Sequence, residues 1–406
     1  MIKVASLFSQ ILHHFPRAEF AVLVKKHDAE RHAKGFTSWA QFVAMIFCHF
    51  AAAESLREIT GGLQSCLGKL RHLGILRPVT RSTLSYANQH RPAQLFQDLF
   101  YATFRHFLAH GGFGHHKNQF RFKNPLLSFD STTISLCLSL FPWAKFRRAK
   151  GGVKVHVLLN HDHYLPAFVH ITPAREHEVK IARLLHLNPG SIVAMDKAFN
   201  DFQLFADWTR KGVYFVTRLK ENTDYRVVRN LPVPQSHHLI SDKIIKLTGV
   251  HAEEKCPHLL RRIVVWDEEH QREIILLTNH LDFGPTTIAA IYKQRWQIEL
   301  FFKALKQNLK VKTFVGTSEN ALHIQIWTAL IALLILRWLH HLARAGWSFA
   351  NCTYLFRLNL FTYRDLTDWL QDPLATEPVI PGPIQLSLPT ISLGQLPSHS
   401  QRGTST

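Results

Sequence analysis

Cysteine is scarce in this sequence of 406 residues, and what there is lies scattered along the chain. The five cysteines are Cys48, Cys66, Cys137, Cys256 and Cys352. Their number is odd and no two form a Cys-x-x-Cys pair, so they support neither a disulfide framework nor a cysteine zinc site. A reducing compartment fits this pattern, and we expect the protein in the cytoplasm.

Long hydrophobic runs are also absent. The longest apolar stretch, residues 326–336, is shorter than the roughly 20 residues that span a bilayer, and it predicts a buried core helix instead. The first residues have no cationic segment followed by an uninterrupted apolar stretch, and His13, His14 and Arg17 come early. Nothing marks the chain for export, and we expect no membrane partner.

Acidic residues are few: the chain has 29 Asp and Glu but 48 Lys and Arg, which gives a net charge of +19. This imbalance predicts a polyanionic partner, with nucleic acid first and an anionic membrane surface second. Hydrophobic residues make up 46% of the chain and include 29 Phe, so the chain can bury a large core. Its length excludes a single small module and its composition excludes a wholly disordered protein.

The hydrophobic patterning divides the chain into segments. Residues 1–110 have apolar residues at helical spacing, over 38–50, 55–67 and 92–109, and are expected to form an all-helical DNA-binding domain. Residues 110–118 contain three glycines and read as a linker. Beyond them we expect strands at 126–134, 153–159, 165–171, 191–195 and 213–219, and helices at 176–187 and 201–211.

The second half of the chain is expected to return to the same core after an insertion. Residues 221–284 read as a β-rich insertion, with strands at 243–250, 259–265 and 274–277, and helices follow at 285–309 and 322–345. The predicted core therefore comprises 119–220 and 285–345, an α/β fold with a mixed sheet covered by helices. Residues 346–406 form a C-terminal extension, loosely ordered from about 373 because prolines are frequent and charges few.

A polar stripe marks the helix predicted at 285–309. Tyr292, Glu299 and Lys306 are spaced by seven residues, which is two helical turns each, and Arg295 lies near the same side. An apolar row containing Ile298 runs beside the stripe and would pack on a core. Glu299 could therefore hold a metal at the edge of a sheet, although an ordinary amphipathic helix with solvated charges is an alternative.

Two further carboxylates lie where a metal site could form. Asp130 falls within a strand-like apolar run, where a charge is costly unless it is paired or bound to metal. Asp196 directly follows a short apolar strand, the place where active sites collect in α/β sheets. Each could instead be a turn or capping residue. With Glu299 they supply three hard oxygen ligands, which suit Mg²⁺ or Mn²⁺.

On these residues the sequence resembles the DDE transposases of bacterial insertion sequences, and among them the IS-four family. Its Tyr-x2-Arg-x3-Glu-x6-Lys signature matches Tyr292, Arg295, Glu299 and Lys306. Residues 195–199 are similar to the second-aspartate motif, with Ala198 where a glycine is usual. Other similar stretches are 126–132, which contains the first aspartate, 215–220, and in the N-terminal region 36–45 and 55–59.

This resemblance implies an RNase H-like catalytic core that binds two Mg²⁺ ions, for which Mn²⁺ can substitute. Asp130 is implied to bridge the ions, with Asp196 and Glu299 each completing one. The implied function is a DNA transposase that binds the terminal inverted repeats of its element, excises it by phosphodiester hydrolysis and transesterification through a hairpin, and integrates it into target DNA. Tyr292, Arg295 and Lys306 are implied to hold the terminal phosphates, and the resemblance further implies a synaptic homodimer on the bacterial nucleoid.

Other residues are candidate DNA contacts on their own chemistry. Five cations lie within ten residues beside two glycines, which predicts a phosphate-binding loop or, alternatively, a solvated turn; they are Lys145, Arg147, Arg148, Lys150 and Lys154. Trp296 on the signature helix is either a core residue or a base-stacking platform. The histidine pairs lack any zinc-binding spacing.

Two other functions stay open at this point. One is an inactive or regulatory DNA-binding derivative, against which the three carboxylates and the polar stripe argue. The other is a metal-dependent nuclease without strand transfer, which composition does not exclude.

Overall fold

The fold is taken from a computed structural model that describes residues 5–31, 33–66, 68–110, 112–113, 120–147, 150–234, 238–249, 251–308, 314–343 and 346–378. Helices occupy the N-terminal region, and side-chain caps begin several of them. Thr37, Ser55 and Thr80 each accept a hydrogen bond from a backbone N–H in the first turn that follows. The helices are α1 (Leu7–His13), α2 (Arg17–Lys26), α3 (Ser38–Ala51), α4 (Leu56–Ser65), η1 (Leu70–Leu73), α5 (Arg81–His90) and α6 (Ala93–Ala109).

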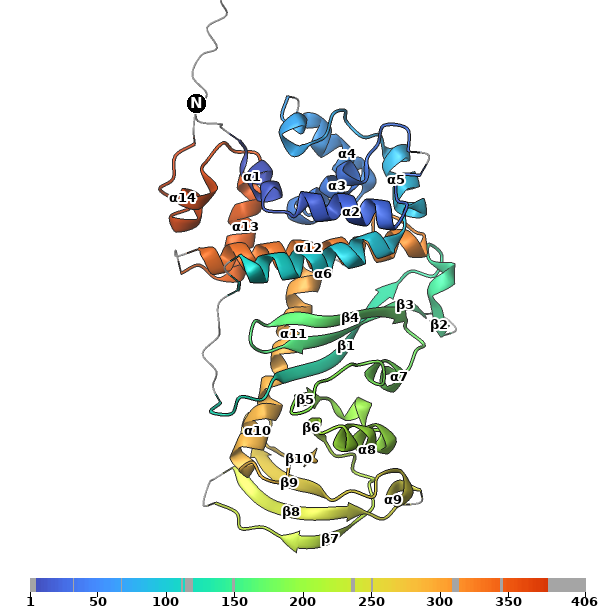
Figure 1. The fold of residues 1–406 in the computed structure, drawn as a ribbon, viewed down its shortest axis with the longest axis vertical. Helices are drawn as coiled ribbons and strands as arrows, with labels where there is room; N and C mark the ends of the chain where they lie inside the picture. Colours follow the sequence, from blue (N-terminus) through green and yellow to red (C-terminus); the bar gives the residue numbers. More distant parts are fainter. Residues whose placement is uncertain are drawn as a thin grey trace, which may run out of the picture.

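In the described residues, ten strands form one mixed sheet that makes up the middle and the far end of the molecule (Figure 1). Its strands are β1 (Leu126–Leu136), β2 (Lys145–Arg147), β3 (Lys150–Asn160), β4 (Leu165–Pro173), β5 (Ile192–Met195), β6 (Tyr214–Arg218), β7 (Tyr225–Asn230), β8 (Leu239–Leu247), β9 (Leu260–Asp267) and β10 (Arg272–Thr278). The order is β2-β3-β1-β5-β6-β10-β9-β8-β7, and β4 pairs with β3. Among these pairs, β1–β5 and β5–β6 are parallel and the others antiparallel.

Helices cover both faces of this sheet. On one face lie α10 (Pro285–Gln294) and α11 (Trp296–Lys303), which continue into the π-helical turn η4 (Ala304–Asn308). The other face carries α7 (Glu178–Ala182), α8 (Phe202–Arg210) and α9 (Ala252–Lys255), with Phe205 and Phe215 stacked between α8 and β6. Short 3-10 turns complete the core at η2 (Pro142–Ala144) and η3 (Lys197–Phe199).

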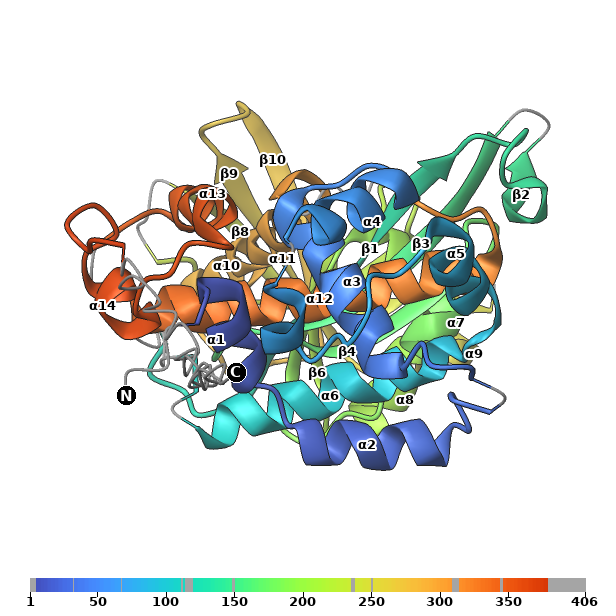
Figure 2. The same ribbon diagram turned by 90° about the horizontal axis from the view of Figure 1, so that it is seen from above.

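The long helix α12 (Glu319–Leu342) lies in the helical layer, packed against α3, α5 and α6 (Figures 1 and 2). His49 of α3 and Thr328 of α12 form a buried hydrogen bond of 3.0 Å. By length and composition α12 could cross a membrane, but 89% of its most apolar window is buried inside the protein, as the sequence predicts for a core helix. The sequence-based division groups α12 with the sheet, whereas its main neighbours are the N-terminal helices.

The C-terminal extension is tied to the other end of the chain. It contains α13 (Phe349–Asn359) and α14 (Leu366–Gln371), and Ser6 pairs with Tyr363 in an isolated bridge. Most of the predicted linker (111 and 114–119) and most of the predicted tail (379–406) lie outside the described residues.

Two predictions about individual elements need correction. The helix expected at 176–187 is limited to Glu178–Ala182, and the helix expected at 285–309 is interrupted at Arg295 and ends in a π turn.

Residues 221–284 contain β7, β8, β9 and β10, and β10 pairs with β6, so this region extends the same sheet. The strands expected there correspond to β8, β9 and β10, whereas β7 was not predicted. The pairing of β10 with β6 depends on contacts distant in sequence.

Candidate active site

The register of the sheet brings Asp130 to the face covered by α11. Asp130 in β1 is paired with Val157 in β3, and Ile134 with Val153, so these side chains share one face. Val157, Val153 and Ile134 are buried in the same apolar cluster as Ile298 of α11. A carboxylate in this row therefore points toward the signature helix.

Asp196 lies on the neighbouring strand, one residue beyond its end. Phe129 of β1 is in register with Met195 of β5, which sets Asp196 beside Asp130. Asp196 caps the turn η3, and its Oδ1 accepts a hydrogen bond of 3.2 Å from the N–H of Ala198. The turn is a 3-10 helix, a conformation that alanine adopts as readily as most residues. One oxygen of the Asp196 carboxylate is therefore fixed by the backbone.

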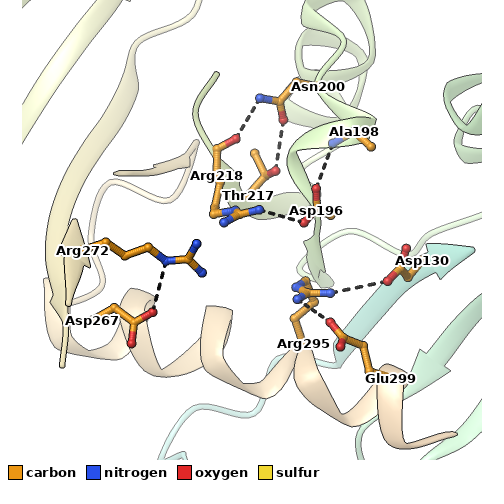
Figure 3. A network of polar contacts seen from close by, with 10 residues as sticks. All are labelled: Asp130, Asp196, Ala198, Asn200, Thr217, Arg218, Asp267, Arg272, Arg295 and Glu299. Atoms are coloured by element: carbon orange, nitrogen blue, oxygen red, sulfur yellow. Dashed lines mark hydrogen bonds and ion pairs between the residues drawn. The ribbon is translucent and has the colours of Figure 1, made fainter. Parts of the chain in front are cut away.

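Arg218, which our sequence reasoning did not single out as a site residue, holds Asp196 from the other side. Its Nη2 lies 3.3 Å from Oδ2 of Asp196, and both side chains are about one quarter exposed (Figure 3). Asn200 donates to the backbone carbonyl of Arg218 at 2.8 Å and accepts from the hydroxyl of Thr217 at 3.0 Å. The available signal was that Arg218 falls in the stretch 215–220, which resembles a family strand.

Arg295 joins the other two carboxylates. Its Nη2 donates to Oε1 of Glu299 at 2.7 Å, and its Nη1 lies 3.4 Å from Oδ2 of Asp130 (Figure 3). The guanidinium also lies 5.7 Å from the ring centre of Tyr292. Arg295 is also the residue at which the helix is interrupted between α10 and α11.

Burial shifts the ionisation of this group. Desolvation raises the pKa of Asp130 to about 6; the Ser131 N–H and Arg295 oppose the rise, whereas Asp196 and Glu299 add to it. Burial also raises the pKa of Tyr292. For Arg295, burial lowers the pKa, but Tyr292 and the carboxylates outweigh it, so the pKa is raised and the guanidinium stays charged. The carboxylates of Asp130, Asp196 and Glu299 thus form a concentration of negative charge that a bound cation can compensate.

The donor set fits a divalent metal ion. Carboxylate oxygens are the ligands that Mg²⁺ and Mn²⁺ prefer, and the guanidinium between Asp130 and Glu299 already compensates their charge. Among the described residues no group of three or more His, Cys, Asp or Glu side chains is close enough to hold a metal as it stands. An ion bound by Asp130 and Glu299 would therefore have to replace their contacts with Arg295.

The predicted DNA contacts on the signature helix have different surroundings. Trp296 is 55% exposed next to Arg295, so the alternative that it is a core residue is wrong. Lys306 is half-buried and donates to the backbone carbonyl of Thr133 in β1 at 3.1 Å. In the chain Trp296 precedes Glu299 within α11, and Lys306 follows it in η4.

The predicted basic cluster is only partly described. Lys145 is exposed at the start of β2, whereas Arg148 lies outside the described residues, as do the side chains of Arg147 and Lys150. Lys154 is 14% exposed and pairs with Glu178 at 2.7 Å. Because this internal contact satisfies the ammonium group, the prediction of a phosphate contact is not kept for Lys154.

An open hollow of about 540 Å³ lies beside Asp196. It is lined by Asp196, Lys197, Ala198, Lys220, Glu221 and Asn222. Both lysines are exposed. The hollow thus places two positive charges next to a carboxylate of the site, an arrangement suited to a phosphate chain that runs past it.

Comparison with known proteins agrees with this arrangement. Residues 121–335 match the family model described as "Transposase DDE domain", and residues 3–76 match "Domain of unknown function (DUF4372)". A probable transposase for insertion sequence element IS5377 of Geobacillus stearothermophilus is 32% identical over 225 residues, which cover 55% of this chain and 59% of that protein. A putative transposase, y4zB, of Sinorhizobium fredii is 33% identical over 241 residues, 58% of this chain and 67% of that protein. The DDE match spans the sheet and all three carboxylates, and the chain therefore belongs to the transposase DDE domain family.

Proposed function

We propose that this protein is the DNA transposase of a bacterial insertion sequence. It binds the terminal inverted repeats of its element, cuts the element out and joins it to target DNA. The observation that carries the proposal is the convergence of Asp130, Asp196 and Glu299 from β1, the end of β5 and α11, held by Arg218 and Arg295. The expected cellular place is the cytoplasm, on the nucleoid.

The catalytic core is proposed to be RNase H-like and to belong to the IS-four family. The strand order β4-β3-β1-β5-β6, three antiparallel strands followed by two parallel ones, supports this assignment. The Tyr292, Arg295, Glu299 and Lys306 spacing supports it independently. The helical layer, residues 1–110 together with α12, is proposed to carry the recognition of the element ends.

Asp130, Asp196 and Glu299 are proposed to hold two Mg²⁺ ions, with Mn²⁺ as a substitute. When bound, such ions activate the attacking oxygen and stabilise the leaving oxygen at phosphorus. The protein itself fixes the three carboxylates. Arg218 and the Ala198 N–H orient Asp196, the Ser131 N–H donates to Asp130 at 2.7 Å, and Arg295 donates to Glu299 at 2.7 Å.

Arg295, Lys306, Tyr292 and Trp296 are proposed to position the DNA end for cleavage through a hairpin. Arg295 would present two parallel N–H groups to a phosphate in place of its contacts with the Asp130 and Glu299 carboxylates. Trp296 is exposed beside it and can stack on an unpaired base. The active assembly on two element ends is proposed to be a homodimer.

The proposal is tested with the purified full-length chain and a plasmid that carries a marker between the two ends of the element. In Mg²⁺ the protein should cut at both ends and release fragments with hairpin termini, visible as slow species on denaturing gels. Cleavage at random positions would instead support a nuclease without strand transfer. Tight binding to the ends without any cleavage in Mg²⁺ or Mn²⁺ would support a regulatory derivative.

A further inference from the structure

One segment of the helical layer contains no acidic residue at all. Between Glu58 and Asp98 the chain has 39 consecutive residues without Asp or Glu, but with Lys69, Arg71, Arg77, Arg81 and Arg91. The segment includes most of α4, together with η1 and α5. Other stretches, such as 99–129, 131–161 and 320–364, also lack Asp and Glu, so the five cations give this segment a net positive charge without making it unique in the chain.

Helix α5 presents one face to the protein and the other to solvent. Its inner face is fixed by buried Leu84, Ala87 and Asn88, and the side chain of Asn88 accepts from Gln41 of α3 at 2.8 Å. Asn320 of α12 also donates to the backbone carbonyl of Asn88, at 2.9 Å. The helix is therefore held rigidly by two neighbours.

The outer face of α5 is a stripe of exposed polar and aromatic side chains. Ser82, Ser85, Tyr86 and Gln89 follow the spacing i, i+3, i+4 and i+7, which places them on one side of the helix. Tyr86 is 65% exposed and stacks on His90, with ring centroids 4.0 Å apart. Within the described part of the chain, no ion pair engages a residue of this helix.

We propose that the outer face of α5 reads base edges in the major groove of the element end. The inference rests on the proposed function and names its recognition surface. Hydroxyl and amide side chains on one helix face hydrogen-bond to bases, and Arg77 and Arg81, both exposed just before the stripe, can contact the flanking phosphates. Duplex DNA is the occupant that matches an acid-free, positively charged surface.

The neighbouring exposed helix α2 gives a useful contrast. Its Lys26 lies 2.6 Å from Asp98, and its Glu19 pairs with Arg105 at 3.3 Å. Positive charge on α2 is therefore partly neutralised within the protein, whereas in the described part of the chain no ion pair engages Arg77 or Arg81. This difference favours α5 as the DNA-binding helix.

The test uses full-length protein and fluorescence anisotropy with a labelled element end and a random duplex. The variants are Gln89→Ala and Ser85→Ala. The control is Gln371→Ala, another exposed glutamine, on α14, which lies at the other end of α12 from α5 (Figures 1 and 2). Gln89→Ala should weaken binding to the element end by roughly five- to a hundredfold and leave random DNA unchanged. Arg81→Ala should weaken both and lower the salt dependence by about one phosphate contact.

Three results separate the possible failures. If wild-type protein cuts and prefers the element end while Gln89→Ala and Ser85→Ala keep that preference, the inference about α5 is wrong and the proposed function stands. Loss of self-association with unchanged DNA preference would likewise overturn it, because α5 would then contact protein. If the wild-type chain itself neither prefers nor cuts the element end, the proposed function is wrong, and the inference about α5 is wrong with it.

Discussion

Asparagine in place of Asp130 should make the metal-free protein more stable at neutral pH. Burial raises the pKa of this carboxyl from 3.8 to about 6, so the folded protein holds its proton more tightly than the unfolded chain does. One pKa unit corresponds to about 1.4 kcal/mol, and ionised Asp130 therefore costs the folded state about 3 kcal/mol. The asparagine side chain carries no charge and avoids this cost.

The sign of the pH dependence is opposite to that of most aspartates. Below the unfolded pKa, near 4, Asp130 is protonated in both states and the variant should gain about 0.5 kcal/mol or less. The gain grows as the pH rises through the folded pKa near 6, and it should be complete, at about 3 kcal/mol, above pH 7. For a chain of this length that is roughly 3 °C in Tm.

The assay is thermal unfolding in EDTA from pH 4 to pH 8, with Asp98→Asn as the control. Burial raises the pKa of Asp98, but hydrogen bonds from Lys26 and His27 outweigh it and leave the pKa lowered. Asp98→Asn should therefore reduce Tm at neutral pH, the reverse of Asp130→Asn. If Asp130→Asn lowers Tm at pH 8, the carboxyl is held in its charged form and the electrostatic description of the site is wrong.

The remaining predictions concern three other positions. Arg295→Ala should reduce hairpin formation by roughly ten- to a hundredfold and affect nicking less, and Arg295→Lys should restore only part of the hairpin formation, because an ammonium lacks the forked geometry of a guanidinium. If added Mn²⁺ fully restores hairpin formation by Arg295→Ala, then Arg295 acts on the metal site and not on a phosphate. Trp296→Ala should leave Tm unchanged but slow hairpin formation, whereas Trp296→Phe should retain most of the wild-type rate of hairpin formation. If the two variants form hairpins at equal rates, Trp296 does not act by stacking. Asp242→Ala should cost about 3–5 kcal/mol in urea unfolding, since it strands Arg261, 5% exposed and 2.6 Å from Oδ2 of Asp242; a loss under about 1 kcal/mol would contradict this.

Elements built from local patterns could be predicted well from the sequence. Short apolar runs located β1, β5, β6 and β9, and helical spacing located α3, α6, α8 and α12, because these signals depend on which residues of each element are buried. The same patterns do not reveal which elements meet. The packing of α12 against α3 and α6, and the pairing of β10 with β6, follow from long-range complementarity that periodicity does not encode.

The residues of the candidate site could likewise be predicted from the sequence only in part. Helical spacing identified Glu299 as a candidate, and the apolar strands around Asp130 and before Asp196 identified those two residues. The sheet register explains why Asp130 faces α11. The salt bridges from Arg295 to Asp130 and from Arg218 to Asp196 could not be predicted, because each joins side chains from different elements. The exposure of Trp296 was undecided for the same reason, since a helix position alone does not say what covers it.

Asp130, Asp196 and Glu299 are proposed to cut DNA together, and end cleavage by their neutral variants shows whether they do. Asp130→Asn, Asp196→Asn and Glu299→Gln should each abolish Mg²⁺-dependent cleavage of a labelled element end while binding that end nearly as tightly as wild type. The control Asp201→Asn removes a nearby carboxylate that caps α8 and pairs with Arg183, and it should retain cleavage. Wild-type cleavage by any one of the three variants would remove that residue from the active site and contradict the account.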